Sequence, residues 1–450
     1  MVLGVETKIE IKKLLQLSIP IAIGELSGVL MNLIDALMIG PLGTEAVAAV
    51  SAANAVYLLF SILGIGASLV IAPMVSTAFS QKDMAKCRSL WYGGVIFSSV
   101  LAIILMGCIG LAAWKFEWLG QETGVTIKGK AFLFYLMPCV FPLILYLQFK
   151  HYADGISYPR LGMLMSISAL CIDAFLNWLL IYGNWGFPTL GLNGAAITNT
   201  ITQFIVMIGM LILLKNIPSF KVILRSGKEK LKSNISDAMA IFSEAMPVGF
   251  QTVLEYAAYG FGAIMIGWVN ATELAAHQIA INVAMSSFMI ILAFGAGGAI
   301  RVGAAVGRND VAQMKLSGKV SLAVGVCFVL LPCVVFICIP ATLASHFIEE
   351  PEVVALAIPL IVVAGIFQVA DSLQSVSQAL LRGLGDYRFP SIITFVCYWM
   401  IGLPIGAYLC FELHLHALGI WIGFLISLLL QAILFSRRFF VLVANWNLSK

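Results

Sequence analysis

The sequence predicts an all-α integral membrane protein with 12 transmembrane helices in two pseudo-symmetric six-helix bundles. Three observations lead to this fold class: an apolar composition, long apolar runs, and a second half that repeats the first. Hydrophobic residues make up 61% of the 450 residues and charged residues only 11%. Soluble domains contain about 45–50% apolar and about 25% charged residues, so we exclude a water-soluble globule.

The apolar runs favour helices over a β-barrel. A bilayer offers the backbone no hydrogen-bond partners, so only helices or closed barrels span it. Barrel strands alternate apolar and polar residues, whereas this chain has continuous runs such as 322–344, long enough for a spanning helix of about 20 residues. The predicted spans are 14–38, 50–78, 89–113, 131–150, 161–183 and 191–214, then 239–267, 276–304, 317–341, 354–381, 390–411 and 415–440.

The Lys and Arg residues are distributed unevenly between the two sides of this topology. Only Lys115, Lys128 and Lys130 fall in loops on one side, and the other 23 of the 26 lie on the opposite side or at its rim. Because basic loops stay in the cytoplasm, we expect both termini and the basic loop after 214 to be cytoplasmic in a bacterial-type inner membrane. We interpret this loop as lying beside anionic lipid rather than nucleic acid.

The second half of the chain repeats the first at an offset of about 227 residues. Pro20 aligns with Pro247, and Asp83 aligns with Asp310 in matching loops where both are expected to be turn or capping residues. Repeats of this kind indicate a duplicated bundle. Each proline removes a helical hydrogen bond and predicts a kink, and we treat Pro20 as a candidate hinge.

The repeat divides the chain into an N-terminal lobe 1–214, a basic cytoplasmic linker 215–238 and a C-terminal lobe 239–450. Six spans are an even number, so both lobes enter the membrane from the same side. Such lobes are related by an axis along the membrane normal, with substrate bound between them. This organisation is typical of transporters.

Five acids lie well inside predicted spans, where an ionised side chain costs about 2.5–3.5 kcal/mol and is a functional candidate by default. They are Glu25, Asp35, Asp173, Glu255 and Asp371. No Lys or Arg is predicted at comparable depth, since Arg301 is placed at the cytoplasmic end of its span. We therefore expect neutralisation by salt bridges to be largely unavailable. A proton, a metal cation or a cationic substrate has to neutralise these acids instead.

Competition for these acids predicts an antiport mechanism. Burial favours the protonated form of a carboxylic acid and a nearby cation favours the ionised form, so a proton, Na⁺ and an organic cation exclude one another. Asp173 and Asn177 are four residues apart and share a helix face, and Glu255 and Asp371 form a second candidate pair in the C-terminal lobe.

Two other residues receive weaker assignments. Tyr256 is a candidate for an aromatic wall that binds cations. Glu25 is a secondary candidate with an alternative structural role, a bond to Ser27 or to a neighbouring helix.

Cysteines and catalytic motifs argue against an enzyme. Eight of the nine cysteines lie in predicted spans and none forms a CxxC pair, so they are interpreted as small core residues. No HExxH motif is present, and no nucleophile, base and orienting acid can be placed together. We expect no catalytic residues and no cofactor beyond a coupling ion.

Five segments resemble the multidrug and toxic compound extrusion (MATE) family. They are DALMIGPLGTEAVAAVS from Asp35, LNWLLIYGNWGFPTLGLNGAAIT from Leu176, LAAHQIAIN from Leu274, AIRVGAAVGRND from Ala299 and ALLRGLGDYRFP from Ala379. The resemblance implies two six-helix lobes, a central cleft, and export of amphipathic organic cations in exchange for Na⁺ or H⁺. Cationic drugs or dyes are then the expected substrates, and the protein is expected to work as a monomer.

The resemblance also implies roles for individual residues. Asp35 is similar to the first-helix acid of the N-terminal lobe, and Glu255 and Asp371 are similar to the carboxylates of the NorM-like branch, which implies a candidate Na⁺ site. Many relatives place an Asn four residues before an Asn or Asp in the fifth helix, whereas here Asp173 precedes Asn177. This difference leaves open which lobe couples to the ion.

Two other carriers are alternatives. A flippase or exporter of lipid-linked or other metabolites from the same superfamily would favour a cleft rich in Arg and Lys, which the predicted spans lack. A major-facilitator carrier also has six plus six helices, but its usual Gly- and Arg-rich loop is not matched by FSQKDMAKCRS.

Overall fold

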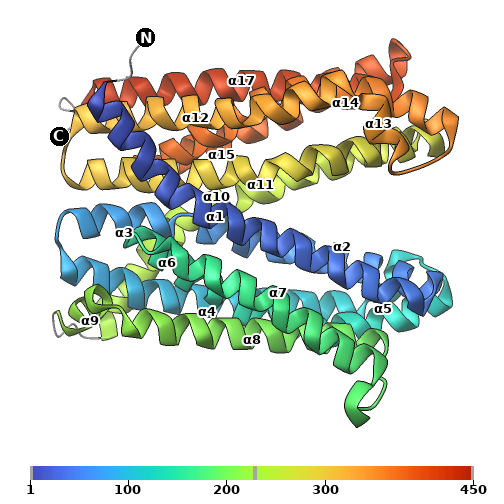
Figure 1. The fold of residues 1–450 in the computed structure, drawn as a ribbon, viewed down its shortest axis with the longest axis horizontal. Helices are drawn as coiled ribbons and strands as arrows, with labels where there is room; N and C mark the ends of the chain where they lie inside the picture. Colours follow the sequence, from blue (N-terminus) through green and yellow to red (C-terminus); the bar gives the residue numbers. More distant parts are fainter. Residues whose placement is uncertain (1–3, 227–230, 447–450) are drawn as a thin grey trace. The chain divides into compact units, whose positions relative to one another are not determined.

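The computed structural model describes residues 4–226 and 231–446, and these residues are almost entirely helical (Figure 1). The long helices are α1 (Val5–Ile39), α2 (Thr44–Ser68), α4 (Met84–Trp114), α6 (Val140–Gly155), α7 (Pro159–Tyr182), α8 (Leu192–Asn216), α10 (Leu231–Gly267), α11 (Ala271–Gly307), α12 (Val311–Cys338), α14 (Pro351–Gly383) and α17 (His416–Ala444). The shorter ones are α3 (Ile71–Ser80), α5 (Thr123–Leu136), α9 (Pro218–Arg225), α13 (Pro340–Ser345), α15 (Arg388–Phe395) and α16 (Leu403–Ala407). Two π-helical segments, Val396–Gly402 and Tyr408–Glu412, adjoin α16.

Eleven segments of the described chain are long and apolar enough to cross a membrane. Each coincides with one of the predicted spans. The remaining prediction, 239–267, coincides with α10, which is long but less apolar because it contains Gln251, Glu255 and tyrosines. The predicted fold class, a helical membrane protein with two bundles, is confirmed.

The chain forms two compact units, and the boundaries between them fall inside α1 and inside α10. The C-terminal unit contains residues 1–22 and 250–450, and the N-terminal unit contains residues 23–249. Helix α1 therefore passes from one unit to the other two residues after Pro20, and α10 does so two residues after Pro247. The units differ from the predicted lobes at these ends, because a repeat indicates topology but not which helix ends pack together. Helix α9 lies within the predicted linker.

Equivalent loops begin equivalent helices in the two halves. Asp83 precedes α4 and accepts a hydrogen bond from the backbone N–H of Lys86 at 2.8 Å. Asp310 precedes α12 and accepts one from Gln313 at 2.9 Å. Both aspartates satisfy an amide that the helix itself leaves free. Their predicted capping role is confirmed.

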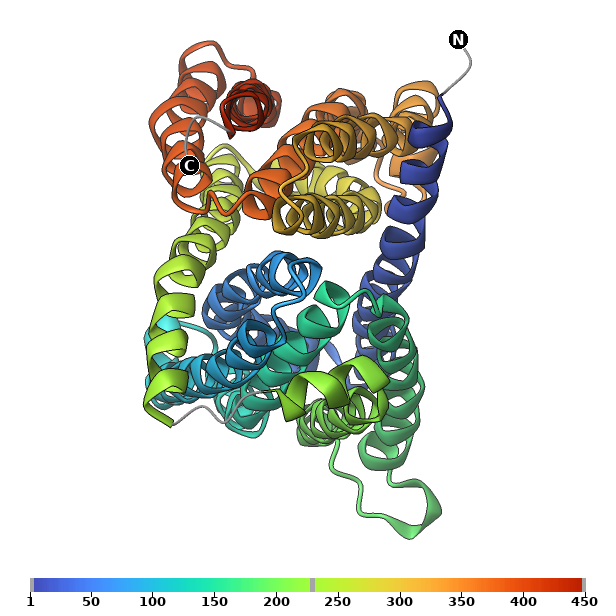
Figure 2. The same ribbon diagram turned by 90° about the vertical axis from the view of Figure 1, so that its left-hand side faces the viewer.

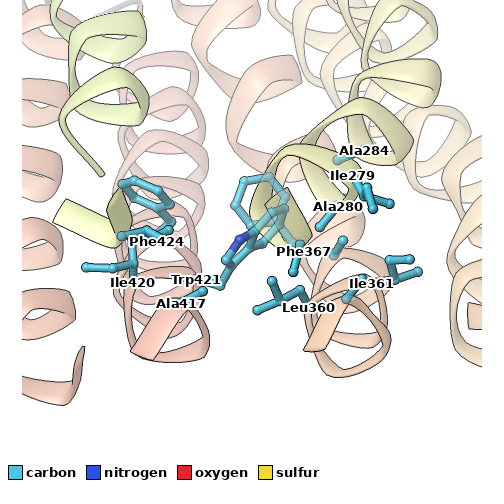
Figure 3. Packing of buried hydrophobic residues seen from close by; sticks show 14 of the residues in the cluster. Ile279, Ala280, Ala284, Leu360, Ile361, Phe367, Ala417, Ile420, Trp421 and Phe424 are labelled. Atoms are coloured by element: carbon cyan, nitrogen blue, oxygen red, sulfur yellow. The ribbon is translucent and has the colours of Figure 1, made fainter. Parts of the chain in front are cut away.

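Apolar packing holds each unit together. In the N-terminal unit, the ring of Trp91 from α4 lies 4.8 Å from Phe220 of α9 and 5.1 Å from Phe149 of α6. In the C-terminal unit, a buried cluster joins α11, α14 and α17, which are drawn yellow to red in Figure 2 (Figure 3). Trp421 of α17 packs there at 5.6 Å from the Phe367 ring of α14.

A buried ionic network attaches the start of α1 to the C-terminal unit. Only 2% of Glu10 is exposed. Its carboxylate accepts hydrogen bonds from Arg301 Nε at 2.9 Å and Nη2 at 2.5 Å, from Gln313 at 2.7 Å and from Ser317 at 2.6 Å. A bidentate guanidinium contact with two further donors fully satisfies the carboxylate. This explains why residues 1–22 pack with α11 and α12.

Replacing Glu10 with Ala is expected to lower the free energy of unfolding by about 3–5 kcal/mol, because Arg301 would be left buried without its counter-ion. Thermal unfolding of the detergent-solubilised protein measures this loss. Glu6→Ala, at an exposed acid one turn earlier in α1, is the matched control. Equal melting temperatures for the two variants would contradict the anchoring role.

Candidate functional site

A cavity in the C-terminal unit contains two of the predicted acids. Glu255 projects from α10 and Asp371 from α14, and both line this cavity together with Tyr256. Glu255 experiences the charge of Asp371 and, with the opposite sign, that of the buried Arg382 of α14, with which it forms no salt bridge. Asp371 Oδ1 also lies 3.1 Å from the hydroxyl of Ser375. The structure therefore brings together the three residues predicted for this lobe.

The cavity wall is aromatic. Tyr259, Phe367, Trp421 and Phe424 line it beside the two acids. The Tyr259 hydroxyl lies 2.9 Å from that of Tyr398, which fixes one edge of the wall. Aromatic faces next to carboxylates are a chemical match for an organic cation.

The donor set also suits a hard monovalent cation. Glu255 and Asp371 supply carboxylate oxygens, and Gln368 lines the same cavity with a buried Oε1 that has no hydrogen-bond partner in the described residues. Oxygen ligands of this kind are preferred by hard cations. Across 4–226 and 231–446 no cluster of three His, Cys, Asp or Glu residues forms a metal site, so any ion would rely on these mixed oxygens.

The N-terminal unit contains a second polar site, built from α1, α7 and α8. The Asn177 amide nitrogen donates to Asp35 Oδ1 at 2.5 Å and to Asp173 Oδ2 at 2.9 Å. Asp173 and Asn177 are both 0% exposed. One amide therefore joins the two acids, and Asn177 Oδ1 is left buried without a partner among the described residues. The predicted trio is brought together.

Sequence reasoning missed one member of this site. Asn199 of α8 donates from Nδ2 to Asp35 Oδ2 at 3.2 Å, and Thr202 lies beside Asp173. The sequence did contain an indication of these residues, because Asn199 and Thr202 are polar and lie three residues apart inside the predicted span 191–214. The span contains other polar residues, however, and nothing local indicates which of them turn toward Asp35.

Glu25 differs from the other four acids. Lys150 of α6 donates to its carboxylate at 2.5 Å, and only 5% of the Lys150 side chain is exposed. The expectation that no Lys lies at comparable depth was wrong for this residue. Helix α6 continues to Gly155, so Lys150 is not at a helix end, and its stem packs against Gly162, where there is no side chain. The structural alternative for Glu25, a bond to a neighbouring helix, is present, while its candidacy as a site residue stays a prediction.

Pro20 lies inside α1, which is helical throughout from Val5 to Ile39. The helix therefore continues without a break through Pro20, where a kink was predicted. Its role as a hinge stays a prediction.

Each of the two helical units contains a pair of intramembrane acids, and no Lys or Arg of the described chain forms a salt bridge with these four acids. Two such units define a polytopic membrane transporter. The MatE family model matches residues 20–179 and 247–408. The chain belongs to the MatE family. The two matched segments begin at Pro20 and Pro247, the prolines aligned by the repeat. The resemblance and the expectation of a transporter rather than an enzyme are therefore confirmed.

Named relatives and solved structures agree with this family. The probable multidrug resistance protein NorM of Mesorhizobium japonicum is 28% identical over 445 residues, covering 95% of this chain and 93% of the relative. The multidrug resistance protein NorM of Photobacterium profundum is 27% identical over 438 residues, covering 95% of each chain. The eukaryotic MATE transporter AtDTX14 matches the fold with a TM-score of 0.85 at 20% identity, over 96% of both chains. A MATE transporter in an outward-facing conformation matches with a TM-score of 0.87 at 18% identity, over 97% of this chain and 96% of the other.

The Glu25–Lys150 pair predicts an asymmetry between single and double variants. Lys150→Met is expected to lower the free energy of unfolding by up to about 3–5 kcal/mol, because Glu25 loses its counter-ion, whereas Glu25→Gln with Lys150→Met recovers much of that loss. Thermal unfolding in detergent measures both. Lys128→Met, which breaks an exposed pair with Glu45, is the control. A double variant less stable than the single one would contradict this assignment.

Proposed function

We propose that the protein is a secondary active multidrug efflux antiporter that exports amphipathic organic cations in exchange for H⁺ and/or Na⁺. The observation that carries this proposal is that four intramembrane acids form no salt bridge within the described chain. They are Asp35, Asp173, Glu255 and Asp371. An acid without a basic partner is neutralised by a proton or by a bound cation, and these are the two species that an antiporter exchanges.

The neighbours of the acids support such an exchange. Asn177 and Asn199 donate neutral hydrogen bonds to Asp35, which orient its carboxylate without cancelling its charge. In the other unit Ser375 plays the same part for Asp371. A proton or Na⁺ bound at either pair would lower its attraction for an organic cation, so the two bind alternately in the cycle of an alternating-access carrier.

The relatives support the substrate class. Proteins 27–28% identical over most of the chain are named multidrug resistance proteins. Cationic drugs or dyes fit the two acids and the aromatic wall of the C-terminal cavity. The alternative, a flippase for lipid-linked phosphates, finds less support, since no Lys or Arg is among the residues that line this cavity.

We extend the proposal to the setting of the protein. The uneven distribution of Lys and Arg favours cytoplasmic termini in a bacterial-type inner membrane. The protein would work there as a monomer in contact with lipid. No nucleic acid partner is proposed.

Reconstitution into proteoliposomes tests the mechanism. Flux of a fluorescent organic cation is followed with an imposed Na⁺ gradient at equal pH, and separately with a pH gradient without Na⁺. Wild type is expected to need one of the two gradients. The variants compared with wild type are Asp35→Asn, Asp173→Asn, Glu255→Gln and Asp371→Asn. Substitutions in the pair of acids that binds the coupling ion should lower the transport rate at least about tenfold. This factor corresponds to roughly 1.4 kcal/mol of free energy. The affected pair identifies the lobe that carries the ion.

Glu117→Gln is the matched control for these variants. Glu117 lies outside the spans, and the hydrogen bond from Lys130 at 2.9 Å lowers its pKa, so it is an ionised acid far from either site in sequence. Removing its charge should leave transport unchanged. Full transport by all four site variants, or transport without any gradient, would overturn the proposed mechanism.

A further inference from the structure

His277 is a buried titratable residue that none of the roles described so far uses. It projects from α11 into the cavity that contains Glu255 and Asp371, and only 1% of it is exposed. No other histidine is among the residues that line this cavity.

One hydrogen bond determines the protonation state of this imidazole. His277 Nδ1 lies 3.1 Å from Nε1 of Trp421. An indole N–H can only donate, so Nδ1 has to accept and cannot carry a proton. The proton of the neutral ring is then on Nε2. A doubly protonated ring would place an N–H against the indole N–H, so Trp421 opposes the charged form.

Packing holds Trp421 in the position that this bond requires. The indole is buried between α17 and α14, with the Phe367 ring 5.6 Å away (Figure 3). The rings of His277 and Trp421 are themselves 6.0 Å apart in an edge-to-face arrangement. Because Trp421 is buried in this cluster, its hydrogen bond to Nδ1 lies within the core of the unit.

The titratable groups around His277 come from three helices, and burial of the ring itself disfavours a charge on it. Glu255, Tyr256 and Tyr259 face the cavity from α10, Asp371 faces it from α14, and Glu273 lies one turn earlier on α11. Carboxylates near an imidazole favour its protonated form. An imidazolium here would act as an internal counter-ion and compete with a cationic substrate.

The other ring nitrogen is available to a ligand. Nε2 makes no hydrogen bond to the part of the chain that the structure describes, and the residue lines the cavity. A neutral imidazole with its proton on Nε2 presents one donor. Beside two acids and an aromatic wall, this donor complements an acceptor atom on a bound cation.

We propose that His277, kept neutral by its burial and by the indole N–H of Trp421, is a specificity-determining residue of the C-terminal cavity whose Nε2–H donates a hydrogen bond to an exported organic cation. The ligand class is organic cations with a carbonyl or ether oxygen, in preference to cations without an acceptor. This inference rests on the proposed function, since it requires organic cations in this cavity.

Two probes separate the hydrogen bond from cation binding in general. Rhodamine 6G has ester and ether oxygens, and tetraphenylphosphonium has no acceptor. Binding to the full-length protein in detergent, without any gradient, is measured by calorimetry. His277→Ala is expected to weaken rhodamine 6G about tenfold, the loss of one hydrogen bond, and tetraphenylphosphonium less than about twofold. His277→Gln, which retains a donor and an acceptor, should recover most of the rhodamine 6G affinity.

Equal losses for both probes, without recovery by His277→Gln, would overturn the specificity role and indicate a structural one. If wild type binds neither cation, the proposed function fails first and this inference fails with it. If wild type binds both probes and His277→Ala weakens rhodamine 6G more than tetraphenylphosphonium, the result supports the proposed function and this inference.

Trp421→Phe tests the second half of the proposal, because it removes only the indole N–H and keeps an aromatic ring. The imidazole is then free to take up a second proton. Between pH 8 and pH 6, tetraphenylphosphonium affinity should fall at least about threefold further in Trp421→Phe than in wild type. Adding His277→Gln should abolish this extra pH dependence. A Trp421→Phe profile that follows wild type would overturn the role of Trp421.

Discussion

Hydrocarbon cannot solvate a carboxylate, and the arrangement of this protein follows from how each acid in the spans or at their ends meets that constraint. Glu10 accepts four hydrogen bonds, two of them from Arg301, and Glu25 accepts one from the buried Lys150. Basic side chains of the protein neutralise both of these acids, and we call Glu10 and Glu25 the anchors because each attaches α1 to neighbouring helices. The other four form no salt bridge in the described residues, although Arg382 acts on Glu255 at longer range: Asp35, Asp173, Glu255 and Asp371. These four are the acids that the proposed exchange uses.

The two anchors lie on the same helix, one on each side of Pro20. Glu10 attaches the start of α1 to the C-terminal unit, and Glu25 attaches its continuation to the N-terminal unit. Helix α10 also contributes to both units and carries Pro247 near the point of division. Each of these two helices therefore supplies residues to both units.

The two polar sites differ in chemistry as well as in position along the chain. In the N-terminal unit amides surround two acids, and Asn177 contacts both. In the C-terminal unit two acids share a cavity with aromatic rings and with His277. Amide and carboxylate oxygens favour a small ion, whereas an aromatic wall favours a bulky organic cation. The two sites of the chain therefore differ in what surrounds their acids, amides in one unit and aromatic rings in the other.

The sequence by itself determined the spans, the duplication and the identity of the intramembrane acids, because the apolar runs and the acids within them are local features of the chain. Only the tertiary structure decided which acids are neutralised and by what. Lys150 pairs with Glu25 across 125 residues, Asn199 reaches Asp35 across 164, and Trp421 meets His277 across 144. Such contacts depend on how each helix is rotated about its axis, and packing sets that rotation rather than any local pattern.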